Sequence, residues 1–341
     1  MKSLQLIEER KLELVDGPDP AAPGANEVQV AMKSVALNHI DVWGYRGMAF
    51  AQRTLPIVVG AEGVGEVVAV GSDVTAYKPG DRVALYGGKT CGYCDACKEG
   101  RDNLCENIMG VMGFHVDGMA AELINIEARL VVPIPDGVSW TDAACAPVTF
   151  STVEHMLFDN AKLKKGEKIL IHAAGSGIGS SAIRMAKDLD CEVFTTVGSE
   201  EKVAKAKALG ADHVINYNEK RFESYVRRQT GKKGVDVVFE HIGPDTWAGS
   251  LFALKRGGRL VTCGSTSGVS AETNLFSVFQ QQLHIFGSFG APIRSVADGL
   301  DKMARGIRPV IDSEFDIGDL QLGLDRLINR QVFGKVVIHI Q

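Results

Sequence analysis

The sequence predicts an α/β protein with two domains, one of which contains a doubly wound parallel sheet. Three observations support this prediction. The chain has 341 residues, more than a typical single domain. Its first 130 residues or so consist of short β segments separated by turns, whereas residues 165–287 alternate between strands and helices, as a parallel sheet requires. Apolar residues make up 45% of the chain and charged residues 23%, the balance of an ordinary globular protein.

Charge and hydropathy exclude several classes of function. The 37 basic and 42 acidic residues give a net charge of −5 without a dominant basic stretch, so a nucleic-acid partner is not expected. No apolar run approaches the roughly 20 residues that a membrane span needs, so no membrane partner is expected either. The N-terminal residues lack the apolar core of a signal peptide, and we therefore expect a cytoplasmic location.

The first domain begins with alternating and glycine-bounded segments. Residues 28–35 alternate as a half-buried strand does, and residues 63–71 and 81–85 are further strands bounded by turns. Residues 332–340 end the chain in another strand, which we expect to rejoin this domain. The predicted first domain is therefore discontinuous, and comprises residues 1–148 and 288–341.

A loop at residues 91–105 contains four of the seven cysteines, namely Cys91, Cys94, Cys97 and Cys105. An odd total of seven cysteines in a long chain that lacks a signal-peptide pattern argues against a disulfide framework. Four thiolates close a tetrahedral zinc site with no open position, so the loop predicts one structural zinc per chain. The alternative is four unrelated free thiols on a surface loop.

The second domain, predicted over residues 149–287, repeats a strand–helix pattern. Residues 178–189 show apolar side chains at helical spacing. The strands of the series are expected at residues 168–172, 192–197, 213–217, 235–240 and 259–263.

A glycine-rich turn connects the first of these strands to its helix. It consists of Gly175, Ser176, Gly177, Ile178 and Gly179. Glycines allow a tight turn and a close approach of backbone N–H groups to a pyrophosphate, which the helix N-terminus also attracts. In this strand–turn–helix context the turn predicts dinucleotide binding. The alternative is a turn that serves only helix–strand packing.

The residues after the next strand favour NADP(H) over NAD(H). An NAD site usually carries an acidic residue about 20 residues after the glycine turn, where this chain has Val197 and Gly198. This leaves room for a 2′-phosphate, with Ser199 as a hydrogen-bond donor, Lys202 as a positive charge and Tyr217 nearby. Alternatively, Ser199 caps the following helix and Lys202 is solvated.

Together these motifs resemble the medium-chain dehydrogenase/reductase superfamily, and the resemblance covers essentially the whole chain. The segments that carry it are residues 60–71, 78–83, 91–105, 175–179 and 207–212. The resemblance implies a GroES-like catalytic domain, a Rossmann domain, and an active site in the cleft between them. It also implies a small-molecule substrate and a homodimer or homotetramer, often built by pairing Rossmann edge strands, here near residues 283–287.

The zinc alcohol dehydrogenases of this superfamily hold a second, catalytic zinc with Cys, His and Cys ligands. The matching positions here are Asn38, Ala61 and Cys145. One ligand of three cannot hold zinc tightly. The hydroxyl that relays the alcohol's proton aligns with Ile40, which cannot relay one. A rebuilt metal site that uses His39, Asp41, Glu62 or Cys145 remains an alternative.

The motif at residues 38–47 and that at 145–149 resemble the quinone oxidoreductase and enoyl reductase branch, although the four-cysteine loop is absent from many quinone reductases. We therefore expect reduction of an activated C=C or a quinone, where the developing anion needs only hydrogen-bond donors and a proton. Asn38 is the expected donor to the substrate oxygen, Tyr45 or His39 the expected proton source, and Thr149 lines the nicotinamide pocket. His241 ends a strand where ligands bind in open sheets; the alternative is a core histidine whose hydrogen bonds are satisfied within the protein.

Two other interpretations of the function remain open. The first is an alcohol dehydrogenase or ketone reductase that acts on an unusual substrate through a remodelled or absent metal. The second is a non-enzymatic binding or lens-type protein that keeps a cofactor. The sequence does not name the substrate.

Overall fold

The computed structural model describes residues 1–48 and 53–340 of the chain. It divides into two compact units: Met1–Ser151 together with Ala291–Gln341, and Thr152–Gly290. The predicted boundaries, 148/149 and 287/288, lie three residues before these divisions, and Thr149 lies in the first unit. We describe each unit by itself.

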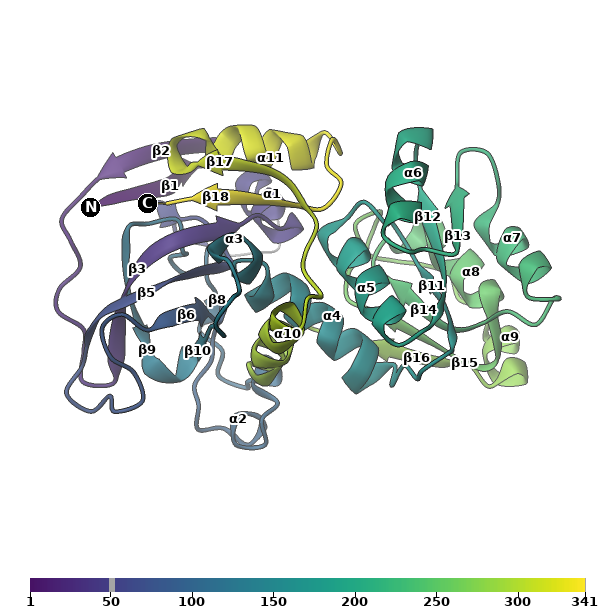
Figure 1. Cartoon of the computed structure of the whole chain (residues 1–341), viewed down its shortest axis with the longest axis horizontal. Helices are drawn as coiled ribbons and strands as arrows, with labels where there is room; N and C mark the ends of the chain where they lie inside the picture. Colours follow the sequence, from purple (N-terminus) through teal and green to yellow (C-terminus); the bar gives the residue numbers. More distant parts are fainter. Residues whose placement is uncertain (49–52, 341) are drawn as a thin grey trace. The chain divides into compact units, whose positions relative to one another are not determined.

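The second unit contains the predicted parallel sheet, in the order β13-β12-β11-β14-β15-β16 (Figure 1). All five neighbouring pairs run parallel, which confirms the α/β, doubly wound class. The central strands consist of almost continuous buried apolar residues because helices cover both faces of such a sheet. The strands are β11 (Lys168–Ile171), β12 (Glu192–Val197), β13 (His213–Asn216), β14 (Val235–Glu240), β15 (Leu254–Thr262) and β16 (His284–Gly287).

The helices of this unit connect successive strands. Ser176 caps the first of them with its side chain, and the buried face of that helix includes Ala182, Ile183 and Met185. A core of Leu170, Phe194 and other apolar residues lies between the sheet and the helices. The helices are α5 (Gly177–Asp188), α6 (Glu200–Ala208), α7 (Phe222–Gln229), α8 (Pro244–Ala253) and α9 (Leu275–Gln281), with the turn η4 (His155–Asn160) before them.

The first unit is built on mostly antiparallel strands. Its largest sheet has the order β10-β6-β5-β3-β18-β17, with β9 also pairing with β3. β18, near the C-terminus, runs antiparallel to β3, so two segments about 300 residues apart lie side by side (Figure 1). The strands of this sheet are β3 (Glu27–Ala36), β5 (Gly63–Val70), β6 (Arg82–Leu85), β9 (Leu123–Glu127), β10 (Val131–Pro133), β17 (Ile311–Asp316) and β18 (Lys335–His339).

Smaller elements complete the first unit. A three-stranded sheet contains β1 (Lys2–Glu8), β2 (Lys11–Asp16) and β4 (Ile57–Val58), and a two-stranded one contains β7 (Gly88–Lys89) and β8 (Gly110–Val111). The helices are α1 (His39–Arg46), α2 (Asp95–Lys98), α3 (Trp140–Ala143), α10 (Arg294–Ala304) and α11 (Leu320–Ile328), and α4 (Ser151–Glu154) begins at the division between the units. The shorter helical segments are the 3₁₀ helices η1 (Asp102–Leu104), η2 (Ala128–Leu130) and η5 (Ile317–Asp319) and the π-helix η3 (Ala146–Phe150).

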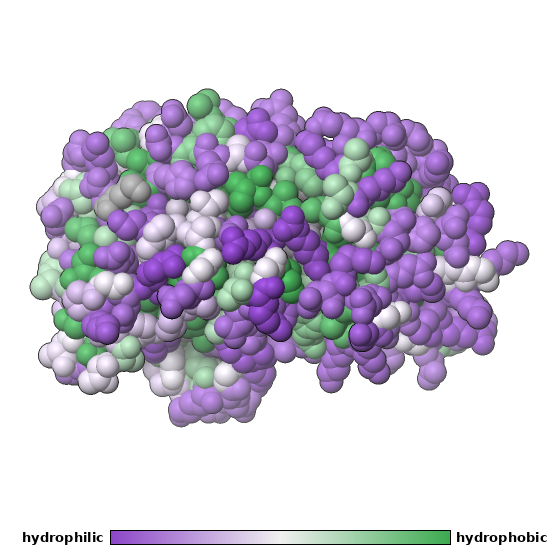
Figure 2. Space-filling model, viewed as in Figure 1, coloured by the Kyte–Doolittle hydropathy of each residue, from purple (hydrophilic) through white to green (hydrophobic). Residues whose placement is uncertain are grey.

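The surface of the second unit that Figure 2 displays is largely hydrophilic, with scattered hydrophobic residues. Within the residues that the structure describes, no helix is both long and apolar enough to span a bilayer.

Candidate functional site

The four-cysteine loop brings its sulfurs together. All four Sγ atoms lie within 4.8 Å of one another. Cys91 Sγ is 3.9 Å from Cys97 Sγ, and Cys94 Sγ is 4.0 Å from Cys105 Sγ. A tetrahedral zinc with Zn–S bonds of about 2.3 Å requires sulfurs about 3.8 Å apart, so this donor set fits zinc. Among residues 1–48 and 53–340, these four cysteines form the one group of three or more side chains whose ligand atoms lie close enough to share a metal ion.

The backbone of the loop supports this geometry. The N–H of Cys94 donates to Cys91 Sγ at 3.4 Å, and the N–H of Cys91 donates to Cys105 Sγ at 3.3 Å. Such bonds stabilise thiolates, and they orient the sulfurs before a metal binds. Gly92 turns the chain with a φ of 77°, a conformation that favours glycine.

The positions that match the catalytic zinc ligands do not form a comparable donor set. Cys145 is completely buried, and burial raises the pKa of its thiol, which disfavours the thiolate that zinc requires. Ala61 has no ligand atom, and Asn38 presents only an amide. The residues at this second position therefore do not fit a tightly bound zinc.

A buried ion pair lies beside these positions. Lys335, at the start of β18, is 2% exposed, and Glu62 is fully buried. Lys335 Nζ donates to Glu62 Oε2 at 3.0 Å, to Asn38 Oδ1 at 2.7 Å and to the Leu37 carbonyl at 2.7 Å. All three ammonium hydrogens are used, so the charge is fully solvated by the protein.

Glu62 is equally saturated. Its Oε1 accepts the N–H groups of Val148 and Thr149 at 2.7 and 2.6 Å. Its Oε2 accepts from Asn38 Nδ2 at 2.8 Å and from Thr149 Oγ1 at 3.1 Å, in addition to Lys335. Five donors occupy the lone pairs of this carboxylate, which leaves none for a metal.

The side chain of Asn38 is held at both ends. Its Oδ1 accepts from Lys335 and lies 3.2 Å from Thr149 Oγ1, whose single hydrogen is shared between Asn38 and Glu62. Its Nδ2 donates to Glu62 and, at the longer distance of 3.2 Å, to the Ala36 carbonyl. Donation to a substrate oxygen, the role predicted for Asn38, therefore requires this hydrogen to leave Ala36.

Asp41 connects helix α1 to the cluster formed by Asn38, Glu62, Thr149 and Lys335. Its Oδ2 accepts the N–H of Asn38 at 2.7 Å, which caps the helix, whereas its buried Oδ1 has no hydrogen-bond partner within the described residues. Burial raises the pKa of Asp41 from 3.8 to about 6, against the lowering effects of the Asn38 N–H and Lys335. Asp41 therefore costs stability when it is ionised.

The two predicted proton donors on α1 occupy different surroundings. His39 is exposed, and its ring lies edge-on to Trp43 with centroids 5.3 Å apart. Tyr45 is half-buried and lines a small cavity of about 10 Å³ that Asp41 also lines. His39 is thus the more accessible of the two.

The glycine turn of the second unit has the geometry expected for close backbone approach. Ser176 Oγ accepts the N–H of Gly179 at 2.9 Å and caps α5. A Cβ at Gly179 would lie only 2.2 Å from the Ala173 carbonyl, so glycine is required where the helix meets the strand. Gly175, Gly177 and Ile178 are partly exposed at the start of the helix.

Gly198, Ser199 and Tyr217 meet at the carboxyl end of β12. A Cβ at Gly198 would lie 2.4 Å from Tyr217 Oη, so the tyrosine hydroxyl occupies the space over this glycine. Tyr217 is 52% exposed. Ser199 Oγ accepts the N–H of Lys202 at 3.4 Å and caps α6. The predicted cap thus exists, and Lys202 lies in the first turn of that helix.

His241 lies in a buried polar network rather than at an open surface. Its Nε2 contacts the His172 carbonyl at 3.0 Å, and burial lowers its pKa. In the same network, Ser250 Oγ donates to Glu240 Oε2 at 2.7 Å and is hydrogen-bonded to His172 Nε2 at 2.8 Å. Burial lowers the pKa of His172 to about 4, against the opposing charge of Glu240, so this imidazole is neutral.

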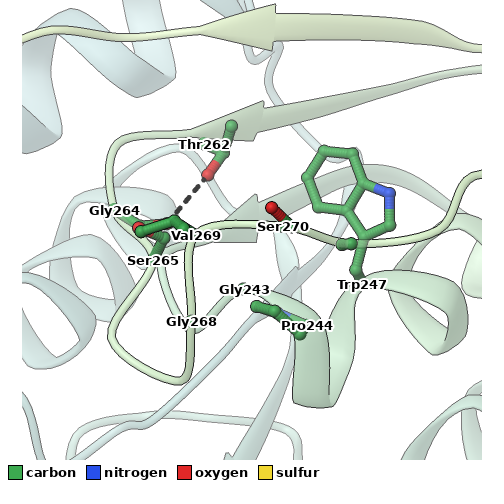
Figure 3. Close-up of a pocket in the computed structure, with 10 residues that line it drawn as sticks. Gly243, Pro244, Trp247, Thr262, Gly264, Ser265, Gly268, Val269 and Ser270 are labelled. Carbon is green, nitrogen blue, oxygen red and sulfur yellow. Dashed lines mark hydrogen bonds between the residues drawn. The ribbon is translucent and has the colours of Figure 1, made fainter.

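A pocket of about 370 Å³ lies at the carboxyl ends of β14 and β15. Figure 3 shows Trp247 and Pro244 of α8 on one side, and the loop that carries Ser265 and Val269 on the other. Its lining residues carry no charge. Thr262 Oγ1 donates to the Gly264 carbonyl at 3.3 Å, so this hydroxyl is already used.

Lys335 was not among the site residues predicted from the sequence. A lysine that opens the strongly apolar run at residues 335–340 was a usable signal, because such a residue is buried only when it is paired. The partners could not be predicted, since they come from positions about 300 residues away.

Comparisons with known proteins agree with this architecture. Residues 24–136 match the family model "Alcohol dehydrogenase GroES-like domain", and residues 177–305 match "Zinc-binding dehydrogenase". A quinone oxidoreductase of Pseudomonas aeruginosa is 32% identical over 94% of this chain and 93% of its own length. An L-threonine 3-dehydrogenase of Shewanella baltica is 32% identical over 99% of both chains. A crystal structure of an NAD-dependent alcohol dehydrogenase is 38% identical, with a TM-score of 0.93 over 100% of both chains. The GroES-like and Rossmann-like assignment is thereby confirmed.

Proposed function

The chain belongs to the medium-chain dehydrogenase/reductase (zinc-type alcohol dehydrogenase) superfamily, and on this premise we propose that it is an NADP(H)-dependent reductase of an activated C=C or a quinone that works without a catalytic zinc. One observation carries the proposal. Where the zinc enzymes place a metal, this chain has Asn38, Ala61 and a buried Cys145 thiol beside the saturated Glu62–Lys335 pair.

The chemistry of this cluster suits an acceptor that needs no Lewis acid. A bound nicotinamide supplies the hydride in this superfamily. When the hydride reaches an electron-poor carbon, the π electrons move to the conjugated oxygen, and that oxyanion needs a hydrogen-bond donor. Asn38 Nδ2 is the proposed donor, once its hydrogen leaves the Ala36 carbonyl. His39 is the proposed source of the proton, because it is exposed; Tyr45 is the second candidate.

The proposed cofactor preference rests on the end of β12. Gly198, under the Tyr217 hydroxyl, places no acidic side chain at the end of β12. Lys202 and the Ser199 hydroxyl are suited to a 2′-phosphate, although Glu200 and Glu201 in the same first turn of α6 count against one. We place the other end of the cofactor toward the carboxyl ends of β14 and β15, near His241 and the pocket of Figure 3. We also propose that Thr149 contacts the nicotinamide.

Replacement of Lys202 by alanine tests the cofactor preference. We expect the Kd for NADPH to rise about tenfold, the loss of one charge-assisted contact, while the Kd for NADH stays unchanged. Fluorescence titration measures both constants. Lys205→Ala, on the same helix, is the matched control. An equal effect on both cofactors, or none on NADPH, would contradict the NADP(H) assignment.

The reaction is tested by zinc analysis together with a substrate panel. The proposal predicts one zinc per chain and NADPH oxidation with an enone or a quinone. Two zinc ions per chain with ketone reduction alone would support the second candidate, an alcohol dehydrogenase or ketone reductase, which the 38% identical alcohol dehydrogenase structure favours.

Assembly is proposed through the edge of the parallel sheet. β16 is the last strand in the sheet order and pairs with β15 alone among the described residues. Ile285 is 40% exposed on it, and Leu275, Phe276 and Phe279 of the adjacent α9 are 59–72% exposed. An unpaired strand with apolar neighbours fits a second copy of the chain, which supports a homodimer or homotetramer. The cytoplasmic location stays a prediction.

A further inference from the structure

We propose that Lys335 is a positioning residue: its ammonium fixes the orientation of the Asn38 amide and strengthens the N–H groups that the amide offers to the substrate oxygen. This inference rests on the proposed function. It starts from a contact that motif matching did not reveal, the 2.7 Å bond from Lys335 Nζ to Asn38 Oδ1.

Hydrogen-bond chemistry alone determines which way the amide points. An ammonium has three donors and no acceptor, so only the oxygen of Asn38 can face Lys335. The NH₂ group must then point toward Glu62 and Ala36, as it does. The Thr149 hydroxyl could accept or donate, so it does not select between the two orientations of the amide.

Glu62 and Lys335 reinforce the same orientation. If the amide turned over, its oxygen would face the Glu62 carboxylate and the Ala36 carbonyl, and its NH₂ group would face the ammonium. Both contacts would be repulsive. The pair thus holds Asn38 in one state inside a site that excludes water, since both charged side chains are buried.

The same contact polarises the amide. A positive charge 2.7 Å from the carbonyl oxygen draws electron density away from the nitrogen and strengthens its N–H groups as donors. Of the two, the hydrogen on Ala36 makes the longer bond, 3.2 Å against 2.8 Å. It is the hydrogen that a substrate oxygen displaces most easily.

In the reductive step Lys335 keeps its proton. The hydride pair forms the new C–H bond, the C=C π pair forms the new double bond to the carbonyl carbon, and the C=O π pair moves onto the substrate oxygen. That oxyanion accepts the Asn38 hydrogen bond. The proton that later neutralises the enolate or hydroquinone anion comes from another group. Lys335 therefore touches neither the substrate nor the hydride.

The decisive variant removes both charges together. Lys335→Met alone would leave Glu62 buried without its counter-ion, so its failure to fold would be uninformative. The double variant Lys335→Met/Glu62→Met replaces the pair by apolar side chains of similar volume. Lys335→Arg keeps a cation that can only donate, and Lys168→Met, at the start of β11, removes a strand-initial lysine elsewhere.

We expect the double variant to bind NADPH with a Kd within twofold of the wild type and to lose about 100-fold in kcat, with little change in KM. Lys335→Arg should recover at least tenfold of that loss, and Lys168→Met should keep wild-type kcat. The wild-type kcat in a double variant that binds NADPH normally would overturn the proposal. So would a loss confined to KM or to NADPH binding.

A second measurement does not depend on turnover. In ¹⁵N-resolved NMR spectra the Asn38 amide proton that bonds the Ala36 carbonyl should move upfield in the double variant, because the polarising charge of Lys335 is gone while its acceptor is kept. The other proton loses its Glu62 acceptor as well and therefore does not report on Lys335. An unchanged shift of the first proton would overturn the inference even if no substrate is found. A wild-type enzyme that reduces only ketones would overturn the proposed reductase function, while this shift would still decide the role of Lys335.

Discussion

The four-cysteine loop and the cluster around Lys335 both lie in the first unit, and they have opposite chemistry. In the loop, four sulfurs approach within 4.8 Å of one another and receive backbone N–H bonds. In the cluster, one buried thiol remains, and a lysine neutralises the local carboxylate. A polar site can therefore compensate its negative charge either with a metal ion or with a cationic side chain of the protein.

The two regions also differ in how they are assembled. The loop draws its four cysteines from 15 consecutive residues, whereas the cluster joins residues 38, 62, 149 and 335. A metal can therefore organise the loop locally, and only the folded unit can organise the cluster.

The largest effect is expected in the loop. Cys94→Ser should abolish the single bound zinc and lower stability by several kcal/mol, below the roughly 10–16 kcal/mol that zinc contributes to small zinc domains. Metal analysis and thermal unfolding measure both. Cys263→Ser, outside the loop, should keep its zinc. A Cys94→Ser protein that still holds one zinc would remove the contrast between the two regions.

A smaller effect is expected when the cluster loses its anion. Glu62→Gln leaves the Lys335 ammonium buried without a counter-charge and should cost about 3–5 kcal/mol in the free energy of unfolding. Urea denaturation measures it. Glu66→Gln, a partly exposed neighbour on β5, should change stability by less than about 0.5 kcal/mol. Equal effects of the two substitutions would show that the pair is not a special feature.

The smallest effect concerns Asp41 and pH. Its pKa is raised from 3.8 to about 6, so the folded protein binds the proton more tightly and this group loses stability as pH rises from about 4 to 6. Asp41→Asn keeps an oxygen for the Asn38 N–H and removes the titration. Above pH 7 the variant should be about 2–3 kcal/mol more stable than the wild type. Near pH 4 this advantage should vanish; a difference independent of pH would contradict the assignment.

The parallel sheet and its glycine turn could be predicted because their signals are local. The apolar strand at residues 168–171 and the helix that starts at Gly177 are close to their predicted positions, since burial on both faces and helix periodicity leave clear patterns. The four cysteines were equally readable from their spacing.

Some residues of the candidate reducing site could be predicted from the sequence, but their hydrogen-bond partners could not. Asn38 and Thr149 were found by motif, but the sequence did not reveal that the Asn38 amide is already hydrogen-bonded at both ends. Lys335 was missed because its role depends on the pairing of β18 with β3, a contact across about 300 residues. Pairing at such separations is a tertiary outcome rather than a local pattern.

The placement of Lys335 on β18 also orders events during protein synthesis. The second unit is one continuous stretch, residues 152–290, and it leaves the ribosome entirely before the strand that carries this lysine has been made. Until then, Asn38 and Glu62 flank the strands of a sheet that still lacks β17 and β18, and Lys335 is not yet available to pair with Glu62. The second unit is thus synthesised in full before Lys335, so the proposed reducing site can form only at the end of translation.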